Sequence, residues 1–159
     1  MTADAPLSDR LRARVEAALQ VTFRDPALLA QALTHVSLTR ELDQDDLASN
    51  ERLEFLGDAV IQLAVSEHLF RTVPDGDEGV LSTCRAAVVR KSALARVARE
   101  IHLEEALRLG RSMAEVSARG LQSIAASALE AVLGAVLLDQ GWETARACGL
   151  RILEPRLRE

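Results

Sequence analysis

The sequence contains few of the residues that mark a β-rich protein. Only 3% of its residues are aromatic, tyrosine is absent and proline occurs four times. Alanine, leucine, arginine and glutamate recur instead, and these residues favour helices. The 159 residues, 48% of them hydrophobic, suffice for one compact core and are too few for two ordinary domains. The sequence therefore predicts a single all-α domain that spans residues 1–159.

Cysteine and long apolar runs are also scarce. Two cysteines, Cys84 and Cys148, cannot supply a disulfide framework. The stretch Met1–Arg10 lacks the apolar run of a signal peptide. The longest apolar stretch, Ala131–Leu138, is interrupted by Gly134 and is far shorter than a membrane span. We therefore expect a soluble protein of the reducing cytoplasm with no membrane partner.

The negative charge is concentrated in one segment. The net charge is −5, and the segment from Arg40 to Asp58 carries all of it, with seven acids and two arginines. Proteins that bind nucleic acids usually present a basic surface to phosphates, so the sign of the net charge alone argues against RNA or DNA. A block of carboxylates is either a solvated acidic loop or a site for divalent cations, and the spacing of the acids must separate the two.

Apolar periodicity and capping residues predict about seven helices joined by short loops. The expected helices cover residues 8–19, 26–33, 50–70, 77–89, 92–101, 122–138 and 142–153. Ser8, Asp25, Asn50 and Ser92 are the expected caps, and Pro155 is expected to limit the last helix. Two polar segments, Thr39–Ser49 and Gly110–Gly120, are expected to be loops.

Three acids share one face of the expected helix over 50–70. Glu51, Glu54 and Asp58 stand at positions i, i+3 and i+7, which at about 100° per residue keeps them within about 60° of one another. Each adjacent pair costs a few tenths of a kcal/mol in an isolated helix, so a cation or neighbouring arginines must offset the repulsion. Oxygen ligands of this kind suit magnesium or manganese. From the spacing alone, a merely solvated helix face is an equal alternative.

The run from Asn50 to Val60, Asn-Glu-Arg-Leu-Glu-Phe-Leu-Gly-Asp-Ala-Val, resembles the signature of the ribonuclease III catalytic domain. Other segments resemble the family in the expected order, and together they cover nearly the whole chain: Gln31–Ser37, Asp77–Gly79, Leu81-Ser82, Leu107–Gly110 and Glu130–Ala135. The resemblance implies an all-helical, dimeric domain. It also implies magnesium-dependent hydrolysis of double-stranded RNA that leaves 5′-phosphate ends and short 3′ overhangs.

The resemblance assigns roles to individual acids. Glu54, Asp58 and Glu130 match the metal-site carboxylates of the family. Glu51 and Glu78 match acids beside the scissile phosphate and complete, with Asp58 and Glu130, the expected catalytic set. A bound Mg²⁺, for which Mn²⁺ can substitute, lowers the pKa of its water and neutralises charge on the phosphoryl oxygens. The metal would present positive charge to RNA, so the acidic segment is compatible with RNA binding.

Ser127 departs from the family pattern. The family places a second metal-ligating aspartate three residues before the position of Glu130, and this chain has Ser-Ala-Leu-Glu over 127–130. The serine hydroxyl keeps an oxygen on the ligand face and can hold a metal-bound water, but it carries no charge. The sequence leaves open an enzyme with a weakened metal site and a catalytically impaired dimer that binds RNA or ribosomes. A third interpretation, an acidic helical interaction module, requires the ordered motif matches to be accidental.

Bacterial members of the family usually carry a basic double-stranded-RNA-binding domain after this one, and the present sequence stops at Glu159. The sequence leaves open whether the protein is a natural single-domain member of the family or part of a longer chain. RNA binding is then expected on the dimer surface, with Arg108, Arg111 and Arg119 as candidate phosphate contacts. A merely solvated loop is the alternative for these arginines.

Phe55 lies between two of the site acids in sequence but on another helix face. The resemblance implies that it packs across a homodimer interface, and an ordinary core position is the alternative.

The leading interpretation of the whole sequence is an endoribonuclease acting on structured RNA, such as hairpin precursors of ribosomal RNA.

Overall fold

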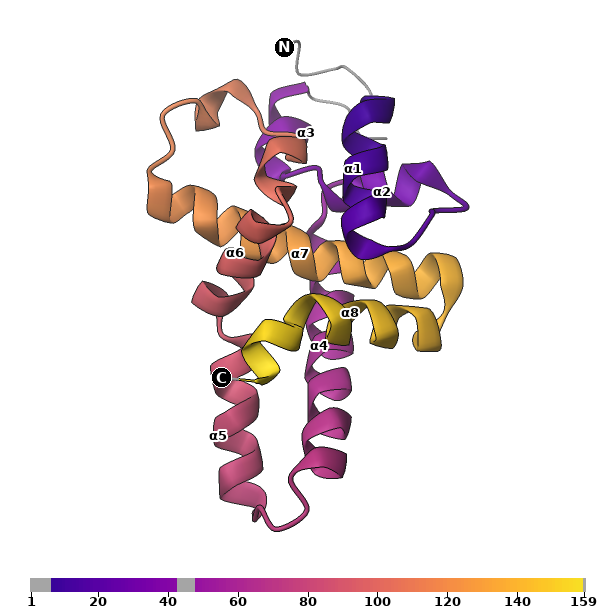
Figure 1. Cartoon of the computed structure of the whole chain (residues 1–159). Helices are drawn as coiled ribbons and strands as arrows, with labels where there is room; N and C mark the ends of the chain where they lie inside the picture. Colours follow the sequence, from indigo (N-terminus) through magenta and orange to yellow (C-terminus); the bar gives the residue numbers. More distant parts are fainter. Residues whose placement is uncertain (1–6, 43–47, 159) are drawn as a thin grey trace.

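The computed structural model describes residues 7–42 and 48–158, which are mostly helical (Figure 1). Within these ranges, β-structure is limited to one isolated bridge between Thr34 and Arg108. The predicted all-α fold is confirmed. In chain order the elements are α1 Asp9–Leu19, α2 Pro26–Ala32, α3 Val36–Leu42, α4 Glu51–Thr72, α5 Glu78–Val89, α6 Lys91–Glu100, η1 Leu103–Ala106, η2 Arg111–Met113, α7 Ala118–Gln140 and α8 Trp142–Leu157, where η denotes a 3₁₀-helix.

The central helix is α7, which packs against α2, α4, α6 and α8. Its alanine, valine and leucine side chains from Ile124 to Val136 are mostly buried in the core. By length and composition α7 is the one helix in the described part of the chain that could cross a membrane, and more than half of its apolar window is buried. Because α7 packs against four other helices, its apolar composition is that of a core helix.

The backbones of α4 and α7 come into contact where the two helices cross near the middle of the molecule (Figure 1). A Cβ atom on Gly57 of α4 would lie 1.7 Å from the carbonyl oxygen of Glu130 in α7. A Cβ atom on Gly134 would lie 2.4 Å from the carbonyl oxygen of Leu53. Because no side chain fits at either position, the two glycines set the separation of the helices. This contact places the acids around Gly57 beside those of α7.

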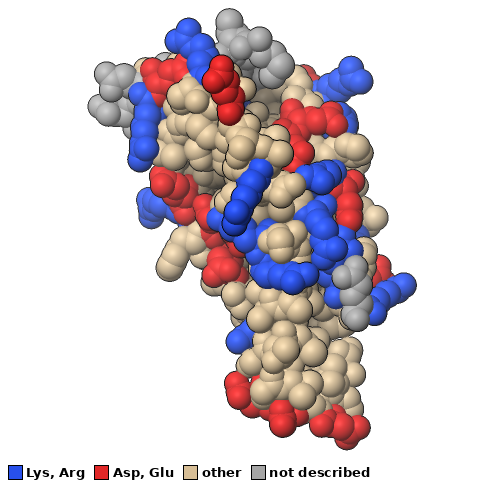
Figure 2. Space-filling view, turned by 90° about the vertical axis from the view of Figure 1, so that its left-hand side faces the viewer, with Lys and Arg blue, Asp and Glu red and all other residues tan. Residues whose placement is uncertain are grey.

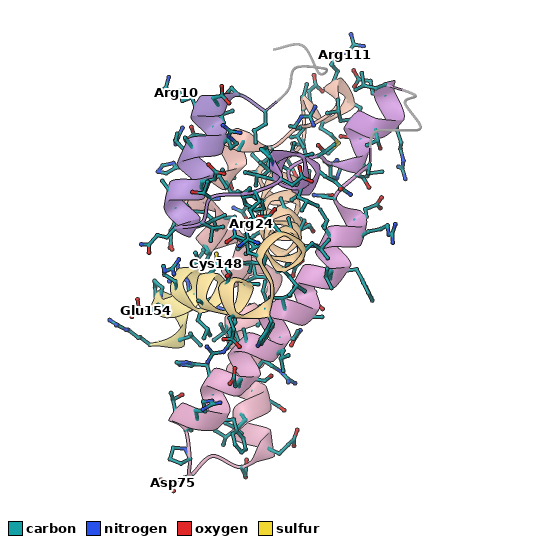
Figure 3. All side chains as sticks on the ribbon, turned by 90° about the vertical axis from the view of Figure 1, so that its right-hand side faces the viewer. Arg10, Arg24, Asp75, Arg111, Cys148 and Glu154 are labelled. Carbon is teal, nitrogen blue, oxygen red and sulfur yellow. The ribbon has the colours of Figure 1, made fainter. Side chains whose placement is uncertain are left out.

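Beyond the crossing, α4 continues away from α7 and pairs with α5 in a hairpin at the lower end of the molecule (Figure 1). Asp75 marks the tip of this hairpin, at the opposite end of the molecule from Arg111 (Figure 3). Two large apolar side chains of α4, Leu63 and Phe70, are 57% and 74% exposed. The hairpin therefore carries apolar surface that the chain itself does not cover.

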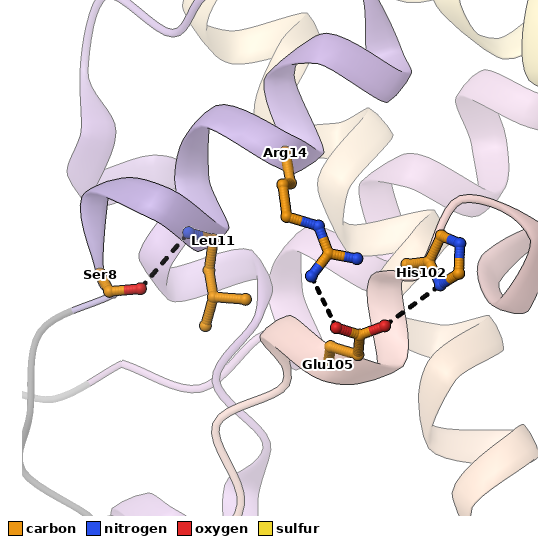
Figure 4. Close-up of polar contacts among 5 residues, drawn as sticks. All are labelled: Ser8, Leu11, Arg14, His102 and Glu105. Atoms are coloured by element: carbon orange, nitrogen blue, oxygen red, sulfur yellow. Dashed lines mark hydrogen bonds and ion pairs between the residues drawn. The ribbon is translucent and has the colours of Figure 1, made fainter.

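Glu105 joins the N-terminal helix to the rest of the fold (Figure 4). Its carboxylate accepts a hydrogen bond from Arg14 of α1 at 2.6 Å and lies 3.1 Å from Nδ1 of His102. Ser8 caps α1 by accepting a hydrogen bond from the backbone N–H of Leu11 at 3.3 Å, as the sequence predicts. The arginine lowers the pKa of Glu105, chiefly through their hydrogen bond.

The predicted loop over Thr39–Ser49 is wrong for its first residues, because α3 extends to Leu42. This short helix buries only Leu38, so its apolar pattern is weak. Its last turn is held from outside, since Glu41 accepts hydrogen bonds from both the backbone and the side chain of Arg111. A tertiary contact therefore stabilises a helix that periodicity does not predict.

The predicted cap at Ser92 is also wrong. Arg90 alone separates α5 from α6, and its carbonyl accepts the first hydrogen bonds of α6 from Ala93 and Leu94. Ser92 thus lies inside the first turn. Ala93 and Leu94 are buried against the core, which favours helix from Lys91 onward.

The last two helices extend beyond their predicted ends. Ser117 caps α7 by accepting a hydrogen bond from Gly120, so α7 begins at Ala118 and the predicted loop is shorter. The final helix, α8, continues through Pro155 to Leu157. Leu157 packs against the core, and this contact offsets the backbone hydrogen bond that a proline cannot donate.

Candidate metal and catalytic site

Three acidic residues, Glu54, Asp58 and Glu130, lie on α4 and α7 around the point where the two helices cross. Glu54 and Asp58 of α4 flank Gly57, whose backbone touches that of Glu130 in α7. The pKa of Glu130 is raised to about 7, first by burial and then by the negative charges of Glu54 and Asp58. Lys91, at the start of α6, opposes this shift. The carboxylates therefore destabilise one another at a half-buried position.

These acids fit a divalent cation by charge and by donor type. Carboxylate oxygens are the preferred ligands of magnesium and manganese, and a cation would relieve the repulsion that raises the pKa of Glu130. Within residues 7–42 and 48–158, however, no three His, Cys, Asp or Glu side chains lie close enough together to hold an ion as they stand. Holding a metal with Glu54, Asp58 and Glu130 therefore requires their side chains to move toward one another.

Ser127 and Glu51 are the remaining predicted site residues on α7 and α4. Ser127 is partly exposed on α7, one helical turn before Glu130. Glu51 is exposed in the first turn of α4 and accepts a hydrogen bond from the hydroxyl of Ser49 at 2.9 Å. Burial lowers the pKa of His35, against the opposing effect of the charges of Glu51 and Glu54. His35 is therefore an electrostatic neighbour of the site that the sequence does not reveal.

Glu78 lies apart from the other site acids within one chain. It occupies the first turn of α5 at the tip of the hairpin, where it accepts a hydrogen bond from Ser82 at 2.8 Å. The tip is separated from Asp58 by the rest of α4, which ends at Thr72 and spans on the order of 20 Å at about 1.5 Å per residue. The acids Asp43, Asp45 and Asp46 of the acidic segment lie outside the described residues.

The three candidate arginines have different surroundings. Arg108 is half-buried, and its guanidinium donates a hydrogen bond to the hydroxyl of Thr34 at 2.9 Å. Arg111 is exposed and pairs with Glu41, its Nε lying 2.5 Å from the carboxylate. Arg119 is exposed in the first turn of α7. Of the three, Arg111 and Arg119 are the ones exposed to solvent.

Phe55 lies on the outer face of α4 and is 81% exposed, so its alternative placement in the chain's own core is wrong. It borders a hollow of about 690 Å³. Leu28, Leu56 and the 59% exposed Leu138 contribute its apolar walls. An exposed aromatic ring and an apolar hollow thus lie side by side on one surface.

Asn50 has a structural role that the sequence does not predict. It occupies the cap position before α4, but its side chain makes no cap hydrogen bond and donates instead to the carbonyl of Ala32 at 3.3 Å. The predicted capping contact is therefore wrong, although the predicted start of the helix is right.

The contact of Gly57 with α7 had a signal in the sequence, because glycine is unfavourable inside a helix unless a close approach requires it.

Comparison with known proteins identifies the family. Residues 25–156 match the family described as Ribonuclease-III-like. The chain belongs to the ribonuclease III family. Ribonuclease 3 of Pelotomaculum thermopropionicum is 50% identical over 137 residues, which are 86% of this chain and 57% of that protein. Ribonuclease 3 of Streptomyces coelicolor is 48% identical over 131 residues, 82% of this chain and 47% of that protein. The chain spans about half the length of the curated relatives it matches.

Solved structures give the same result for the fold. A nuclease domain of ribonuclease III from Campylobacter jejuni matches with a TM-score of 0.82 and 36% identity, over 92% of this chain and 98% of that one. That structure is described as flexible in a region involved in dimer formation. A second structure of the same domain matches with a TM-score of 0.81. The predicted ribonuclease III fold is confirmed, and the described residues form a nuclease domain of this family.

Proposed function

We propose that this ribonuclease III domain is a metal-dependent endoribonuclease that hydrolyses phosphodiester bonds in double-stranded RNA, including structured precursors of ribosomal RNA. The observation that carries the proposal is the state of Glu130, whose pKa is raised to about 7 by burial and by two neighbouring carboxylates. Groups with strongly shifted pKa values are enriched at functional sites. A divalent cation converts this unfavourable group of charges into a favourable one.

In this proposal Glu54 and Glu130 hold Mg²⁺ or Mn²⁺, and Asp58 contributes directly or through water. The bound metal supplies an activated water and positive charge for the phosphoryl oxygens. The residues come from two helices whose spacing is set by Gly57, so the backbone holds the two helices in place while the side chains close on the ion. Glu51 is the neighbouring acid of the same group.

Glu78 takes a different part in the proposal. Its separation from Glu130 along α4 excludes it from the metal set of its own chain. It is proposed as an acid that meets the RNA farther along the α4–α5 hairpin.

We also propose that the chain acts as a homodimer with Phe55 at the interface. The exposed ring and the adjacent hollow lie on the same surface of α4. A two-fold interface brings the same patch of both copies together, so each ring could occupy the hollow of the other copy. Two sites in one assembly also suit a substrate with two strands.

Phosphate contacts are proposed for Arg111 and Arg119, which are exposed on either side of the 114–117 segment. Figure 2 shows Lys and Arg side chains gathered across the middle of one face of the molecule, with acidic side chains at the hairpin end. This distribution supports phosphate contacts across the basic middle of that face. The free thiols of Cys84 and Cys148 are consistent with a cytoplasmic location.

A second candidate function is a catalytically impaired dimer that binds duplex RNA or ribosomes. Two observations favour it: Ser127 supplies no charge one turn before Glu130, and no ready-made group of three ligands is present within residues 7–42 and 48–158. Under this alternative the protein keeps the fold and the RNA-binding surface but does not cleave RNA.

The purified chain, incubated with long double-stranded RNA, separates the two candidates. The proposal predicts cleavage with Mg²⁺ or Mn²⁺ and none with a chelator. Binding of duplex RNA without cleavage at any metal concentration would favour the impaired dimer. Neither binding nor cleavage would contradict both candidates.

A further inference from the structure

Thr34 is a fully buried polar residue between two parts of the site. It lies just after α2, and none of its surface is exposed. Its hydroxyl donates a hydrogen bond to the carbonyl of Ala30 at 2.7 Å and accepts one from the guanidinium of Arg108 at 2.9 Å. A buried hydroxyl that loses such partners is costly, so these contacts fix the side chain firmly.

The segment of residues 33–35, around Thr34, binds Arg108 on one side. The backbone N–H of Arg108 donates to the carbonyl of Leu33 at 2.8 Å, and its carbonyl accepts from the backbone N–H of His35 at 3.0 Å. These two hydrogen bonds form the isolated parallel bridge between Thr34 and Arg108. With the guanidinium contact, three hydrogen bonds connect Arg108 to residues 33–35.

The other side of the segment holds the start of α4. The carbonyl of Thr34 accepts a hydrogen bond from the backbone N–H of Asn50 at 2.9 Å. The side chain of Asn50, 2% exposed, donates to Ala32, and Gln31 donates to the carbonyl of Ser49 at 3.2 Å. Three further hydrogen bonds therefore attach residues 49–50 to the end of α2.

The first turn of α4 follows directly from this attachment. The carbonyl of Asn50 accepts the backbone hydrogen bond of Glu54 at 2.8 Å, and Glu51 is the first residue of the helix. A shift of Asn50 would therefore move both acids. Arg108, although a candidate phosphate contact, aims its guanidinium at Thr34.

We propose that Thr34 and Arg108 form a positioning pair that fixes the start of α4, and with it the placement of Glu51 and Glu54, and that Arg108 does not contact RNA. The effect on metal use rests on the proposed function; the effect on α4 does not.

The functional test compares Thr34→Val, Thr34→Ser and Arg108→Met. Thr34→Val keeps the shape and removes the hydroxyl, whereas Thr34→Ser keeps the hydroxyl. Loss of residues that orient metal ligands typically costs about 10–100-fold in metal affinity or activity. We expect Thr34→Val and Arg108→Met to raise the Mg²⁺ concentration for half-maximal cleavage about tenfold, and Thr34→Ser to stay within about twofold of the wild type.

The control is Thr39→Val. Thr39 lies on α3, and its hydroxyl also donates to a backbone carbonyl, that of Val36 at 2.9 Å. It makes no contact with Arg108 or Asn50 among the described hydrogen bonds. The Mg²⁺ requirement of this variant is expected to equal that of the wild type, which separates the positioning effect from a general cost of losing a threonine hydroxyl.

RNA binding tests the statement about Arg108. The affinity for duplex RNA is measured in chelator over a range of salt concentrations. The positioning pair predicts an unchanged dissociation constant and salt slope for Arg108→Met. A phosphate contact would instead reduce the slope by about 1 and weaken binding, which would overturn the proposal.

Hydrogen exchange of the metal-free protein tests the structural part without any activity. Thr34→Val and Arg108→Met are expected to speed exchange in the first turn of α4 about tenfold relative to Thr39→Val, and to leave α5 unchanged. Unchanged exchange at the start of α4 would overturn the proposal. If the wild type neither cuts RNA nor binds metal, the proposed function fails, and exchange still decides whether the pair positions α4. Should Thr34→Val not fold, Arg108→Met carries the same test with the backbone bridge intact.

Discussion

The two halves of α4 are built in opposite ways. The first half lies against α7 so closely that a Cβ atom at Gly57 would lie 1.7 Å from a backbone oxygen. The second half packs against α5 and α8, with Glu67 paired to Arg146 of α8, and leaves Phe70 74% exposed. The metal-site candidates of α4, Glu54 and Asp58, belong to the tightly packed half. Like charges are thus placed where the backbone is held most firmly.

This difference has a physical reason. Carboxylates that must close on a cation need a support that keeps its geometry when they repel one another, and close helix packing provides it. The hairpin has no such requirement, because Glu78 at its tip is exposed and hydrogen-bonded only to Ser82 among the described residues. We therefore expect changes at the crossing to have larger effects than matched changes in the hairpin.

The largest effect is expected from adding a methyl group at the crossing. Gly57→Ala forces the backbones of α4 and α7 apart and is expected to cost about 3 kcal/mol or more in the free energy of unfolding. Gly79→Ala is the matched change in the hairpin, where the nearest atom, Oδ1 of Asp77, lies 3.4 Å from the added Cβ. It is expected to stabilise the protein by about 0.5–1 kcal/mol, because alanine favours helix. Urea denaturation checks both signs, and equal effects would refute the comparison.

The next effect concerns the exposed rings of the two halves. Phe55→Ala is expected to weaken self-association by about 2 kcal/mol, or roughly 30-fold in the dimer dissociation constant, because a buried aromatic anchor would be lost. Phe70→Ala, at the hairpin end, serves as the control and is expected to change it less than threefold. Sedimentation at micromolar concentrations measures both variants. A wild-type chain that stays monomeric would contradict the proposed homodimer.

A smaller effect is expected from the charge on Glu130. Its pKa is raised to about 7, so the ionised carboxylate opposes folding at pH values above 7 and has no effect below the ordinary carboxyl range. Glu130→Gln is therefore expected to stabilise the metal-free protein by about 1–2 kcal/mol at pH 8, and to lose this advantage near pH 4.

Thermal denaturation at the two pH values measures this advantage. Glu78→Gln is the control from the hairpin, and its stability should differ from the wild type by less than about 0.5 kcal/mol at either pH. A Glu130→Gln protein that is less stable than the wild type at pH 8 would contradict the repulsion argument.

The smallest effect is expected at Ser127. Ser127→Asp adds a carboxylate one turn before Glu130, which should lower the metal concentration for half-maximal cleavage several-fold, a change of about 1 kcal/mol. The wild type is expected to respond more strongly to manganese than to magnesium, because manganese binds a depleted site more readily. Titration of both metals checks this. No gain with either metal, together with RNA binding but no cleavage by the wild type, would favour the impaired dimer.

The sequence predicted those features that depend on local chemistry. Ser8 caps α1, Asp77 begins α5, and the 3.6-residue period places Glu54 and Asp58 on one helix. The features it missed depend on distant residues. The last turn of α3 is held by Arg111, and α8 passes Pro155 because Leu157 reaches the core.

The same division applies to the candidate site. The acids were found by motif, whereas their mutual repulsion depends on Gly57 meeting Glu130 from a helix more than 60 residues away in the chain. The role of Asn50 could not be predicted, because an asparagine before a helix usually caps it, and here it donates to Ala32 instead. Glu78 could be matched to the family, and the predicted helix over 50–70 already implies most of its distance from the crossing.

The central claim is that the acids at the crossing, and not the acid of the hairpin, hold the metal. Isothermal titration calorimetry with Mn²⁺ alone tests it on the wild type, Glu130→Gln and Glu78→Gln. The account predicts that the wild type and Glu78→Gln bind Mn²⁺ with equal affinity and that Glu130→Gln binds it at least about 100-fold more weakly. Equal affinity of Glu130→Gln and the wild type, or loss of binding in Glu78→Gln, would contradict the account.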